Sequence, residues 1–485
     1  MTLSDALLIE QNPWWSQPDA WEGRDPHLRR LAAQPVELPP LLADRISLAE
    51  PAVHVVRGPR QVGKSTELKL LARRALAGGR PATDVLYVTL DLLAGEASGS
   101  VVDTVRRAKE LSRCGEGALL LLDEVTAVRD WQVAVKYLWD TGIVDRDVVV
   151  CTGSSAIDLK VGAAERLPGR RGAGIDFLAL PRGFAVFARA LDSRIPASPE
   201  LLPAQLAGEQ GADPLEQARI HLPALQRALE LYAAFGGLPA AVAEAAGGAP
   251  APTEAVKRVV HDALTKEVAR KGASEPALRA LLERVTRSLG SKVNWARMAR
   301  EMGVSLGPGR RPGQGPHGST VRDYFEFLAA AYFLLVIYFW RRDAGSASIS
   351  KDKKIYFADP LLHTVAHDLA PGLAVDMPAL VENLVALALF RRSEPLARQA
   401  ETFAMPDELH VWETAGGGEI DFVCGQRAAP VAVEVRYQRS PDMRKASAIG
   451  RALPGSPVLL VTRDLLQVSE RWTAVPAALA LWALG

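Results

Sequence analysis

The alternation of apolar and polar blocks along the chain predicts an α/β domain in its first half. Four almost wholly apolar stretches are separated by segments with helical periodicity: "AVHVVRG", "DVLYVTLD", "GALLLLDEV" and "DVVVCTGS". Fully apolar strands that alternate with helices are typical of a parallel sheet covered on both faces. The pattern therefore predicts an α/β domain over residues 48–190, preceded by a Pro- and Trp-rich arm over residues 1–47 with little periodicity.

The second half of the chain changes pattern three times. Helical periodicity with Pro- and Gly-rich breaks predicts a helical lid over residues 191–290, and a further helical segment covers residues 291–345. From residue 346 to residue 485 strands and helices mix again. The strand "KKIYFADP" precedes the helix "PALVENLVALALFRR", and the strands "LHVWET", "GEIDFVCG", "PVAVEVRYQ" and "PVLLVTR" follow. This order predicts a separate C-terminal α/β domain.

Composition places the chain among globular proteins. Its 485 residues are 48% hydrophobic and 23% charged with a net charge of +1, so a nucleic-acid surface would have to be a local basic patch. The three cysteines are scattered, which argues against disulfides and structural zinc and fits a reducing cytosol. No signal peptide is visible, and the longest apolar run, Phe327–Trp340, is shorter than the roughly 20 residues that span a bilayer. We therefore expect a cytoplasmic protein without a membrane segment.

A phosphate-binding loop follows the first predicted strand. The sequence "GPRQVGKST" has the Walker A spacing, directly after an apolar strand and before a helix. Its backbone N–H groups and the helix N-terminus would face phosphate, Lys64 would bridge the β- and γ-phosphates of ATP, and Ser65 would place its hydroxyl on Mg²⁺. A chance Gly-rich turn is the alternative. The predicted nucleotide contacts are Gly58, Pro59, Arg60, Gln61, Val62, Gly63, Lys64, Ser65 and Thr66.

The strand "ALLLLDEV" supplies an acidic pair at its carboxyl end, the edge at which α/β sheets bind ligands. We expect Asp123 to hold magnesium through water and Glu124 to orient the attacking water. Alone, such a pair is as easily a solvated strand end. Together with the Walker A loop it favours ATP hydrolysis with Mg²⁺.

Two further segments complete the predicted ATP site. Thr152, Ser154 and Ser155 end the next apolar strand, where a polar side chain would contact the γ-phosphate or the lytic water. The loop "ERLPGRRGAG" carries arginines, of which Arg170 is our candidate for an arginine finger acting on a neighbouring subunit. Such a finger requires a homo-oligomer, whereas a solvated basic loop would not.

The chain resembles a known family at this point. The motifs "GPRQVGKST", "LLLLDEVTAVRDWQVAVKYLWD", "VVCTGSSAIDL", "LPGRRG", "FGGLPAAV", "KIYFADPLL", "VENLVALALFRR", "GEIDFV" and "VEVRYQ" are similar, in order, to prokaryotic AAA+ ATPases with a C-terminal domain of unknown function 4143. The resemblance covers about residues 48–445. It implies an AAA+ core, a winged-helix-like middle segment and a C-terminal fold similar to PD-(D/E)XK nucleases. One departure is "PRGF", where the family shows Pro-Leu-Ser-Phe.

The middle segment is a candidate for DNA binding. "VNWARMAREMGVS" and "STVRDYFEFLAAAYFLL" predict two helices of a helix-turn-helix, although the loop between them is longer than that motif uses. Arg297 and Arg300 on the first helix, and Arg310 and Arg311 in the loop, suit phosphate contacts. The second helix pairs Arg322 with nearby acidic residues, so a packing role within the ATPase is the alternative.

The C-terminal strands carry carboxylates that fit the nuclease-like resemblance. Alternation puts Glu434 and Arg436 on one face of their strand, and Glu419 and Asp421 on one face of the preceding strand. With Glu382 from the apolar helix, Asp421 and Glu434 form the predicted Mg²⁺ site of this fold.

In the resembling family a lysine follows two residues after the last carboxylate, but this chain has Arg436. Arginine keeps its charge and so cannot act as a base. An active nuclease, a metal- or DNA-binding relic and a purely structural domain all remain open.

Two functions follow from the sequence. The first is an AAA+ ATPase that couples its nucleotide state to DNA engagement by the C-terminal half. The second is a slow nucleotide-dependent switch that binds a protein partner in regulation or defence and carries an inactive nuclease-like domain.

Overall fold

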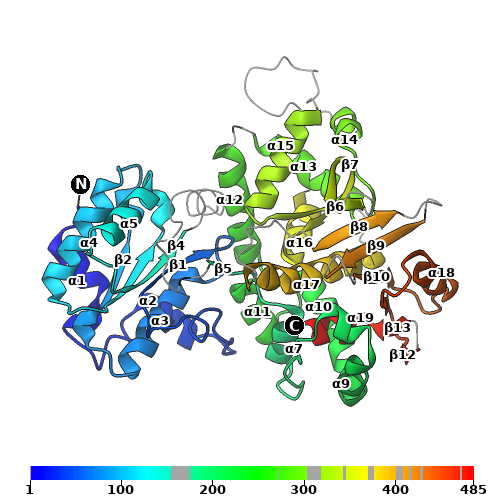
Figure 1. Ribbon diagram of the computed structural model, residues 1–485, viewed down its shortest axis with the longest axis horizontal. Helices are drawn as coiled ribbons and strands as arrows, with labels where there is room; N and C mark the ends of the chain where they lie inside the picture. The colour runs from blue at the N-terminus through cyan, green and yellow to red at the C-terminus, as the bar shows by residue number, and fades with distance from the viewer. Residues whose placement is uncertain are drawn as a thin grey trace. The chain divides into compact units, whose positions relative to one another are not determined.

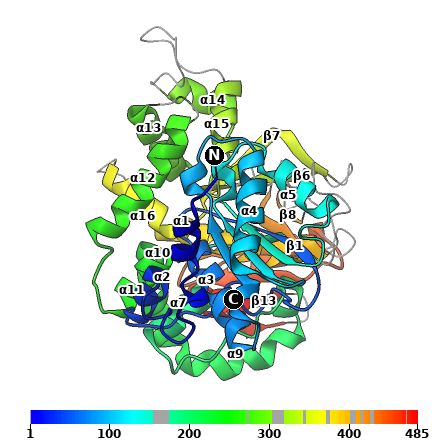
Figure 2. The same ribbon diagram turned by 90° about the vertical axis from the view of Figure 1, so that its left-hand side faces the viewer.

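The computed structural model describes residues 2–153, 174, 176–270, 272, 274–302, 318–341, 346–369, 376–399, 408–413, 418–425, 430–469 and 472–485 (Figures 1 and 2). The chain forms two compact units, Met1–Leu180 and Pro181–Gly485. Several residues of the sequence predictions lie outside the described residues: Ser154, Ser155, Arg166, Arg170, Arg171, Arg310 and Arg311.

The first unit contains a parallel sheet that confirms the four predicted strands. The described strands are β1 (Ala52–Arg57), β2 (Val85–Thr89), β3 (Leu119–Asp123), β4 (Val148–Thr152) and β5 (Asp176–Leu178). They lie side by side in the order β2-β3-β4-β1-β5, and every pairing is parallel. The short edge strand β5 was not predicted.

Helices cover both faces of this sheet (Figure 1). Successive residues of each strand join opposite cores: Leu86 and Val88 of β2 pack in one, and Val85 and Tyr87 in the other. This two-sided burial explains why the strands read as unbroken apolar runs. The helices are α1 (Asp5–Gln11), η1 (Pro13–Trp15), α2 (Pro26–Ala32), α3 (Lys64–Ala77), η2 (Ala82–Asp84), η3 (Asp91–Leu93), α4 (Gly99–Ser112), η4 (Val125–Ala127) and α5 (Trp131–Asp140).

The N-terminal arm is part of this unit and covers the free edge of β2. The Asn12 amide accepts from Tyr87 N–H (2.6 Å) and donates to Tyr87 C=O (2.8 Å). Trp14 Nε1 and Trp15 Nε1 donate to Val85 C=O at 2.8 and 3.0 Å. These side chains satisfy backbone groups that an edge strand otherwise leaves unpaired.

The second unit joins helices to a mixed sheet. Its helices are α7 (Phe184–Leu191), α8 (Pro203–Leu206), η5 (Glu209–Gly211), α9 (Ala212–Ala218), η6 (Arg219–His221), α10 (Leu222–Phe235), α11 (Pro239–Ala246), α12 (Glu254–Arg270), α13 (Glu275–Ser288), α14 (Trp295–Glu301), α15 (Gly318–Ala330), α16 (Pro360–Leu369), α17 (Met377–Gln399), α18 (Arg444–Ala452) and α19 (Ala477–Leu484).

The strands of this unit form one eight-stranded sheet, in the order β12-β13-β11-β10-β9-β8-β6-β7. All predicted C-terminal strands are present, in a sheet that mixes parallel and antiparallel pairs. The strands are β6 (Leu334–Arg341), β7 (Ser346–Phe357), β8 (Leu409–Glu413), β9 (Glu419–Cys424), β10 (Val431–Arg436), β11 (Val458–Thr462), β12 (Gln467–Val468) and β13 (Trp472–Pro476).

The segment predicted as winged-helix-like is continuous with this sheet. Its two predicted helices are α14 and α15, but the apolar run after them turns into β6 instead of extending the helix. β6 pairs antiparallel with β7, so the strand that ends the expected segment and the strand that begins the expected C-terminal domain belong to one sheet. The strand forms because β-branched and aromatic residues fill "LLVIYFW".

Two glycines explain the motif "FGGLP" of the second unit. A Cβ on Gly237 would lie 2.0 Å from the carbonyl oxygen of Arg182, and one on Gly236, at φ +68°, would lie 1.9 Å from an Asp359 carboxylate oxygen. Asp359 accepts hydrogen bonds from Gly237 N–H (2.8 Å) and Leu361 N–H (2.9 Å). Three segments that are far apart in sequence are thus held together where only glycine fits.

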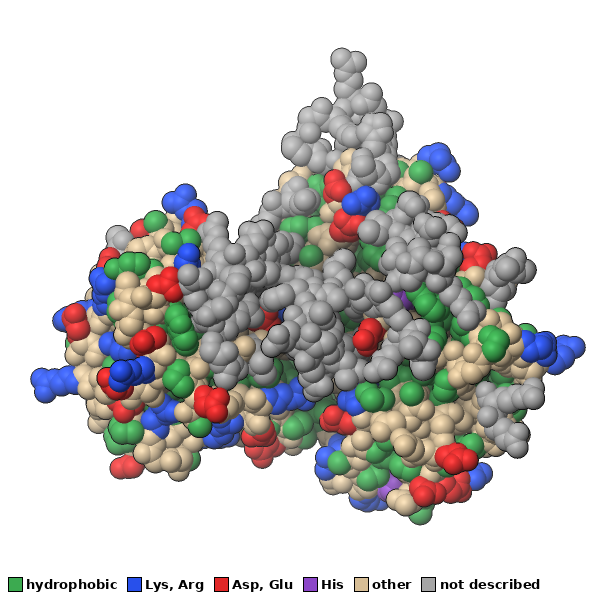
Figure 3. All heavy atoms as spheres, viewed as in Figure 1, with side chains coloured by type: hydrophobic (Ala, Val, Ile, Leu, Met, Phe, Trp, Pro, Cys, Tyr) green, Lys and Arg blue, Asp and Glu red, His purple; other side chains and the backbone are tan. Residues whose placement is uncertain are grey.

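Some expectations from composition can be compared with the structure directly. All three cysteines are free. None of the helices in the described part of the chain combines the length and the apolar character that crossing a membrane requires. On the face seen in Figure 3, acidic and basic side chains are intermixed over the described surface.

Candidate nucleotide site and a second charged network

The phosphate-binding loop joins β1 to α3. Gly58 lies at φ +150°, and a Cβ there would come within 2.0 Å of the Ala179 carbonyl oxygen, because the chain after β5 packs on the loop. Gly63, at φ +98°, immediately precedes α3 in the left-handed conformation, and Gln61 shares that conformation at φ 65°. This backbone turns N–H groups and the N-terminus of a 14-residue helix toward one place, as anion binding requires.

Lys64, the first residue of α3, lies over its own loop. Its Nζ donates to the carbonyl oxygens of Gly58 (3.0 Å) and Pro59 (2.8 Å). Burial lowers its pKa to about 8, against the opposing negative charges of Glu124 and Asp123. The lysine and the acidic pair, almost 60 positions apart in sequence, therefore act on each other in space, as the sequence predicted.

Asp123 is the last residue of β3, and its side chain is buried. Its Oδ1 accepts from the Thr152 hydroxyl at the end of β4, and its Oδ2 accepts from the Tyr87 hydroxyl of β2 at 2.8 Å. Asp123 and Thr152 meet because parallel strands present their carboxyl ends at one edge of the sheet. Tyr87 was not predicted. The sequence pattern could have indicated it, because Val85, Tyr87 and Thr89 are two residues apart and so share a face of β2. Thr89 pairs with Asp123, so Tyr87 lies on the face that Asp123 occupies.

Glu124 directly follows this aspartate with a left-handed backbone at φ 54° and ψ 42°. Its N–H donates to Thr152 Oγ1 at 3.4 Å. A non-glycine residue in this region costs about 1 kcal/mol or more, and such conformations cluster at functional sites. The strain is therefore consistent with the role predicted for Glu124.

The described residues fit ATP and Mg²⁺. Ser65 and Thr66 are only half-buried at the start of α3. Each Asp123 oxygen accepts a hydrogen bond from a neutral hydroxyl, so each keeps a lone pair for a further ligand. Carboxylate and hydroxyl oxygens with water suit Mg²⁺.

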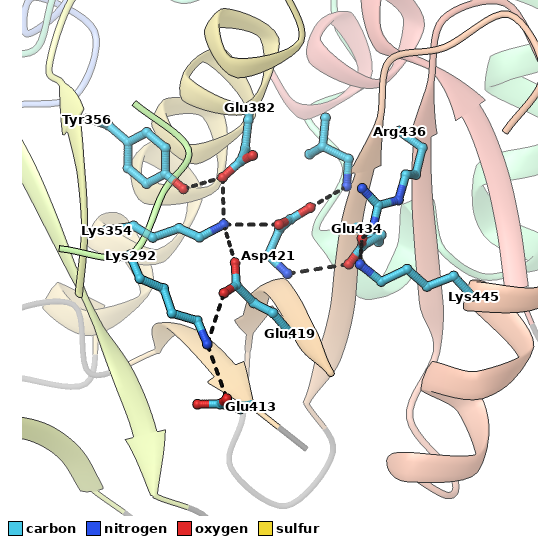
Figure 4. A network of polar contacts seen from close by, with 11 residues as sticks. Lys292, Lys354, Tyr356, Glu382, Glu413, Glu419, Asp421, Glu434, Arg436 and Lys445 are labelled. Carbon is cyan, nitrogen blue, oxygen red and sulfur yellow. Dashed lines mark hydrogen bonds and ion pairs between the residues drawn. The ribbon is translucent and has the colours of Figure 1, made fainter. Parts of the chain in front are cut away.

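A second network lies in the other unit, centred on Lys354 of β7 (Figure 4). Its Nζ lies 2.8 Å from Glu382 Oε1, 2.7 Å from Glu419 Oε1 and 3.0 Å from Asp421 Oδ1. Burial alone would lower the pKa of Lys354, but the three carboxylates together raise it. The sequence placed these carboxylates correctly on neighbouring elements and missed the lysine between them.

Glu434 belongs to the far side of the same network. Its Oε1 lies 2.6 Å from Arg436 Nη2 and pairs with Lys445 Nζ, and its Oε2 accepts from Asp421 N–H at 3.4 Å. The pairing with Arg436 confirms that the two side chains share one face of β10. Lys445, the second residue of α18, was not predicted.

Charge in this network is balanced from within. Burial, followed by the charge of Asp421, raises the pKa of Glu382 to about 7 and that of Glu434 to about 7. Among the residues that the structure describes, no group of three or more His, Cys, Asp or Glu side chains is placed to hold a metal ion. Glu382, Asp421 and Glu434 come close together as predicted, but with ammonium and guanidinium groups as their partners they do not fit a metal ion.

Comparison with known proteins supports the first site. Residues 50–181 match a family described as an AAA domain. The first unit has a P-loop AAA+ core. Residues 226–371 match a domain of unknown function, DUF8612, and the expected likeness to PD-(D/E)XK nucleases stays a prediction. A search of curated protein sequences finds no match.

Three solved structures from archaea show some similarity to this chain. A Walker-type ATPase of Pyrococcus abyssi is 14% identical over 72% of this chain and 95% of its own, with a TM-score of 0.36. The ORC1 protein of Aeropyrum pernix, in complex with DNA, is 15% identical over 74% of this chain and 96% of its own, with a TM-score of 0.30. The ORC2 protein of Aeropyrum pernix, in ADPNP and ADP complexes, is 14% identical over 68% and 90%, with a TM-score of 0.33.

Proposed function

We propose that this protein binds ATP with Mg²⁺ and hydrolyses it at the edge of the first sheet. The observation that carries the proposal is the convergence there of the loop lysine Lys64 with Asp123, Glu124 and Thr152. A Gly-rich turn without function would not require a lysine, an aspartate and a strained glutamate at one end of a parallel sheet.

Each residue has a role in this proposal. Lys64 and the N-terminus of α3 bind the phosphates, Ser65 and Asp123 hold Mg²⁺, and Glu124 orients the attacking water. Mg²⁺, when bound, neutralises charge on the β- and γ-phosphates. Thr152 fixes the Asp123 carboxylate, and Ser154 and Arg170 keep their predicted roles at the γ-phosphate and as a finger in trans.

The test is ATP binding and hydrolysis by the purified protein. Lys64→Ala should abolish binding of a fluorescent ATP analogue, whereas Glu124→Gln should bind it and lose hydrolysis by about 100-fold or more, as expected for loss of a positioned base. Lys136→Ala, on α5 of the same unit, is the control and should behave as wild type. A wild-type protein that neither binds nor hydrolyses ATP would overturn the proposal.

For the output of the cycle we propose a nucleotide-dependent change in how the second unit engages its partner. DNA is the first candidate partner. Against it, Arg297 pairs with Glu301 and Arg322 with Glu326, so these cations of the predicted DNA segment are partly neutralised. These observations favour the alternative, a nucleotide-dependent switch that binds a protein.

The two outputs are separated by measuring ATPase rate and gel mobility with single-stranded, duplex and branched DNA. Stimulation or a shift by any form, lost at high salt, supports the DNA output. No effect of any form supports the switch. Arg170→Ala tests the expected homo-oligomer: it should lower hydrolysis without changing ATP affinity, and mixing it with Lys64→Ala subunits should restore part of the activity.

A further inference from the structure

Tyr87 links the Asp123 carboxylate to the N-terminal arm. Thr89 is the register partner of Asp123, and Tyr87 lies two residues earlier on the same face of the sheet. Its ring therefore reaches diagonally along the sheet, and its hydroxyl donates to Asp123 Oδ2 at 2.8 Å. Burial, and then the charge of Asp123, raise the pKa of Tyr87 far above its usual value, so the hydroxyl remains a donor.

A buried lysine, Lys69, lies over the ring of Tyr87. Lys69 Nζ lies 3.5 Å from the centroid of the Tyr87 ring and 5.0 Å from that of Trp14. The same ammonium lies 3.4 Å from Asp25 Oδ2 and donates to Gln11 C=O at 3.2 Å. Lys69 is 4% exposed, and three of its contacts, with Gln11, Trp14 and Asp25, are with the arm.

The backbone of Tyr87 is held by the arm as well. Asn12 makes hydrogen bonds to both its N–H and its C=O. The position of the Tyr87 hydroxyl therefore depends on contacts made by residues 11–25. The arm also contacts α3, where Asp25 pairs with Lys69 and Glu22 with Arg73, but the contact through Tyr87 reaches Asp123 itself.

We propose that Tyr87 is a positioning residue for the Asp123 carboxylate, and that the N-terminal arm, through Asn12 and Lys69, sets that position. This inference rests on the proposed ATP function. With Thr152 on Oδ1 and Tyr87 on Oδ2, the carboxylate is held in one orientation, and each oxygen keeps a lone pair that would be available to Mg²⁺ or its waters. The arm then acts as an input: anything that displaces it loosens magnesium binding at the ATP site.

Tyr87→Phe removes the hydroxyl and keeps the ring against Lys69 and Trp14. We expect the Mg²⁺ concentration for half-maximal hydrolysis to rise, and kcat to fall, by about 10-fold, the lower end of what outer hydrogen-bond partners of metal ligands contribute. Affinity for a fluorescent ADP without Mg²⁺ should not change, whereas the gain in affinity on adding Mg²⁺ should shrink. Tyr137→Phe, which removes a partly exposed hydroxyl from the same unit, is the matched control.

The role of the arm is tested by combining variants. Asn12→Ala should reproduce part of the Mg²⁺ effect in the wild-type background and add nothing in the Tyr87→Phe background, because both act on one carboxylate. If Asn12→Ala does not fold, Trp14→Phe, which removes the indole donor to Val85 C=O and part of the ring near Lys69, replaces it in the same cycle.

The outcomes separate the two proposals. A wild-type protein that binds no nucleotide refutes the proposed function and this inference with it. An active wild type whose Tyr87→Phe variant keeps its Mg²⁺ dependence refutes the positioning role alone. Equal effects of Asn12→Ala with and without the Tyr87 hydroxyl refute the input from the arm.

Discussion

Replacing Lys354 by methionine tests whether the second network is held together by its ammonium. The wild-type lysine is 1% exposed and contacts three carboxylates at 2.7 to 3.0 Å. Methionine keeps most of the side-chain volume and removes the charge. Glu382, Glu419 and Asp421 would then share a buried site without their common cation.

The expected loss follows from what each carboxylate keeps. Glu382 retains the Tyr356 hydroxyl at 2.6 Å, Asp421 retains Val435 N–H at 2.9 Å, and Glu419 retains Lys292 at 3.3 Å. Removing one partner of a buried ion pair costs about 3–5 kcal/mol, because a buried charge is left uncompensated. The remaining partners keep the loss within that range, so we expect the free energy of unfolding to fall by about 3–5 kcal/mol at neutral pH.

Lys353 provides a matched control one residue away. It is equally buried, at 1% exposure, but its ammonium lies over aromatic rings, 4.5 Å from that of Trp295 and 5.7 Å from that of Tyr338. Burial lowers its pKa to about 8, so its charge is not strongly favoured in the fold. Lys353→Met loses a cation–π contact of about 0.5–2 kcal/mol and gains an apolar side chain, for an expected net change near 1 kcal/mol or less.

Both variants are compared by urea unfolding, followed by circular dichroism and tryptophan fluorescence. With a slope of about 3 kcal/mol per M, the Lys354→Met midpoint should fall by about 1 M or more, and that of Lys353→Met by a third of this at most. Equal losses in the two variants would refute the reasoning. So would stabilisation of the wild type by Mn²⁺ in the unfolding transition of the second unit, since a network closed by Lys354 offers no site to the metal.

Three further predictions concern the second unit. Gly237→Ala forces a Cβ to within 2.0 Å of a carbonyl oxygen and should lower the free energy of unfolding by about 2 kcal/mol or more. Gly450→Ala, on α18 with open space around it, is the control and should raise the free energy of unfolding by about 0.5–1 kcal/mol in the same urea assay. Burial, and then His367, lower the pKa of His363 to about 4, below its usual 6.5. The folded state therefore binds fewer protons than the unfolded state, and the free energy of unfolding should fall by up to about 3 kcal/mol as the pH drops from 6.5 to 4. In His363→Phe this part of the pH dependence should vanish, and its persistence would contradict the assignment. Arg436→Lys should change stability by less than about 1 kcal/mol, because Lys445 still pairs with Glu434, and should not produce Mg²⁺-dependent DNA cleavage; cleavage that Asp421→Ala abolishes would show that the carboxylates can hold a metal after all.

The geometry of the proposed ATP site was predictable because its sequence signals are local. The Walker A spacing fixes a loop between a strand and a helix, and parallel strands bring Asp123 and Thr152 to one edge whatever the loops between them do. The arm was different. Residues 11–15 hold the β2 edge with side-chain hydrogen bonds, which leave no apolar periodicity to read, so the segment was interpreted only as an arm leading into the domain.

The carboxylates of the second network were predictable for the same reason as the strands that carry them. Alternation gave the faces of Glu419, Asp421 and Glu434, and the resemblance added Glu382. Lys354 was missed because nothing in "KDKKIYF" distinguishes a buried lysine from a solvated one. Two adjacent lysines on a strand must point to opposite faces, and only the structure shows that both faces are covered.

The partners of the two buried aspartates explain why we propose divalent-cation chemistry for the first unit and not for the second. Asp123 is held by hydroxyls of Tyr87 and Thr152, which are neutral donors that orient a carboxylate and leave its charge available. Asp421 shares the Lys354 ammonium with two other carboxylates, and this ammonium lies where a metal would have to bind. A cation that competes with this ammonium must also displace it from a buried site, at a cost of several kcal/mol. The same residue type therefore suits the proposed magnesium site in one unit and is closed to the metal in the other, and the partner atoms decide which.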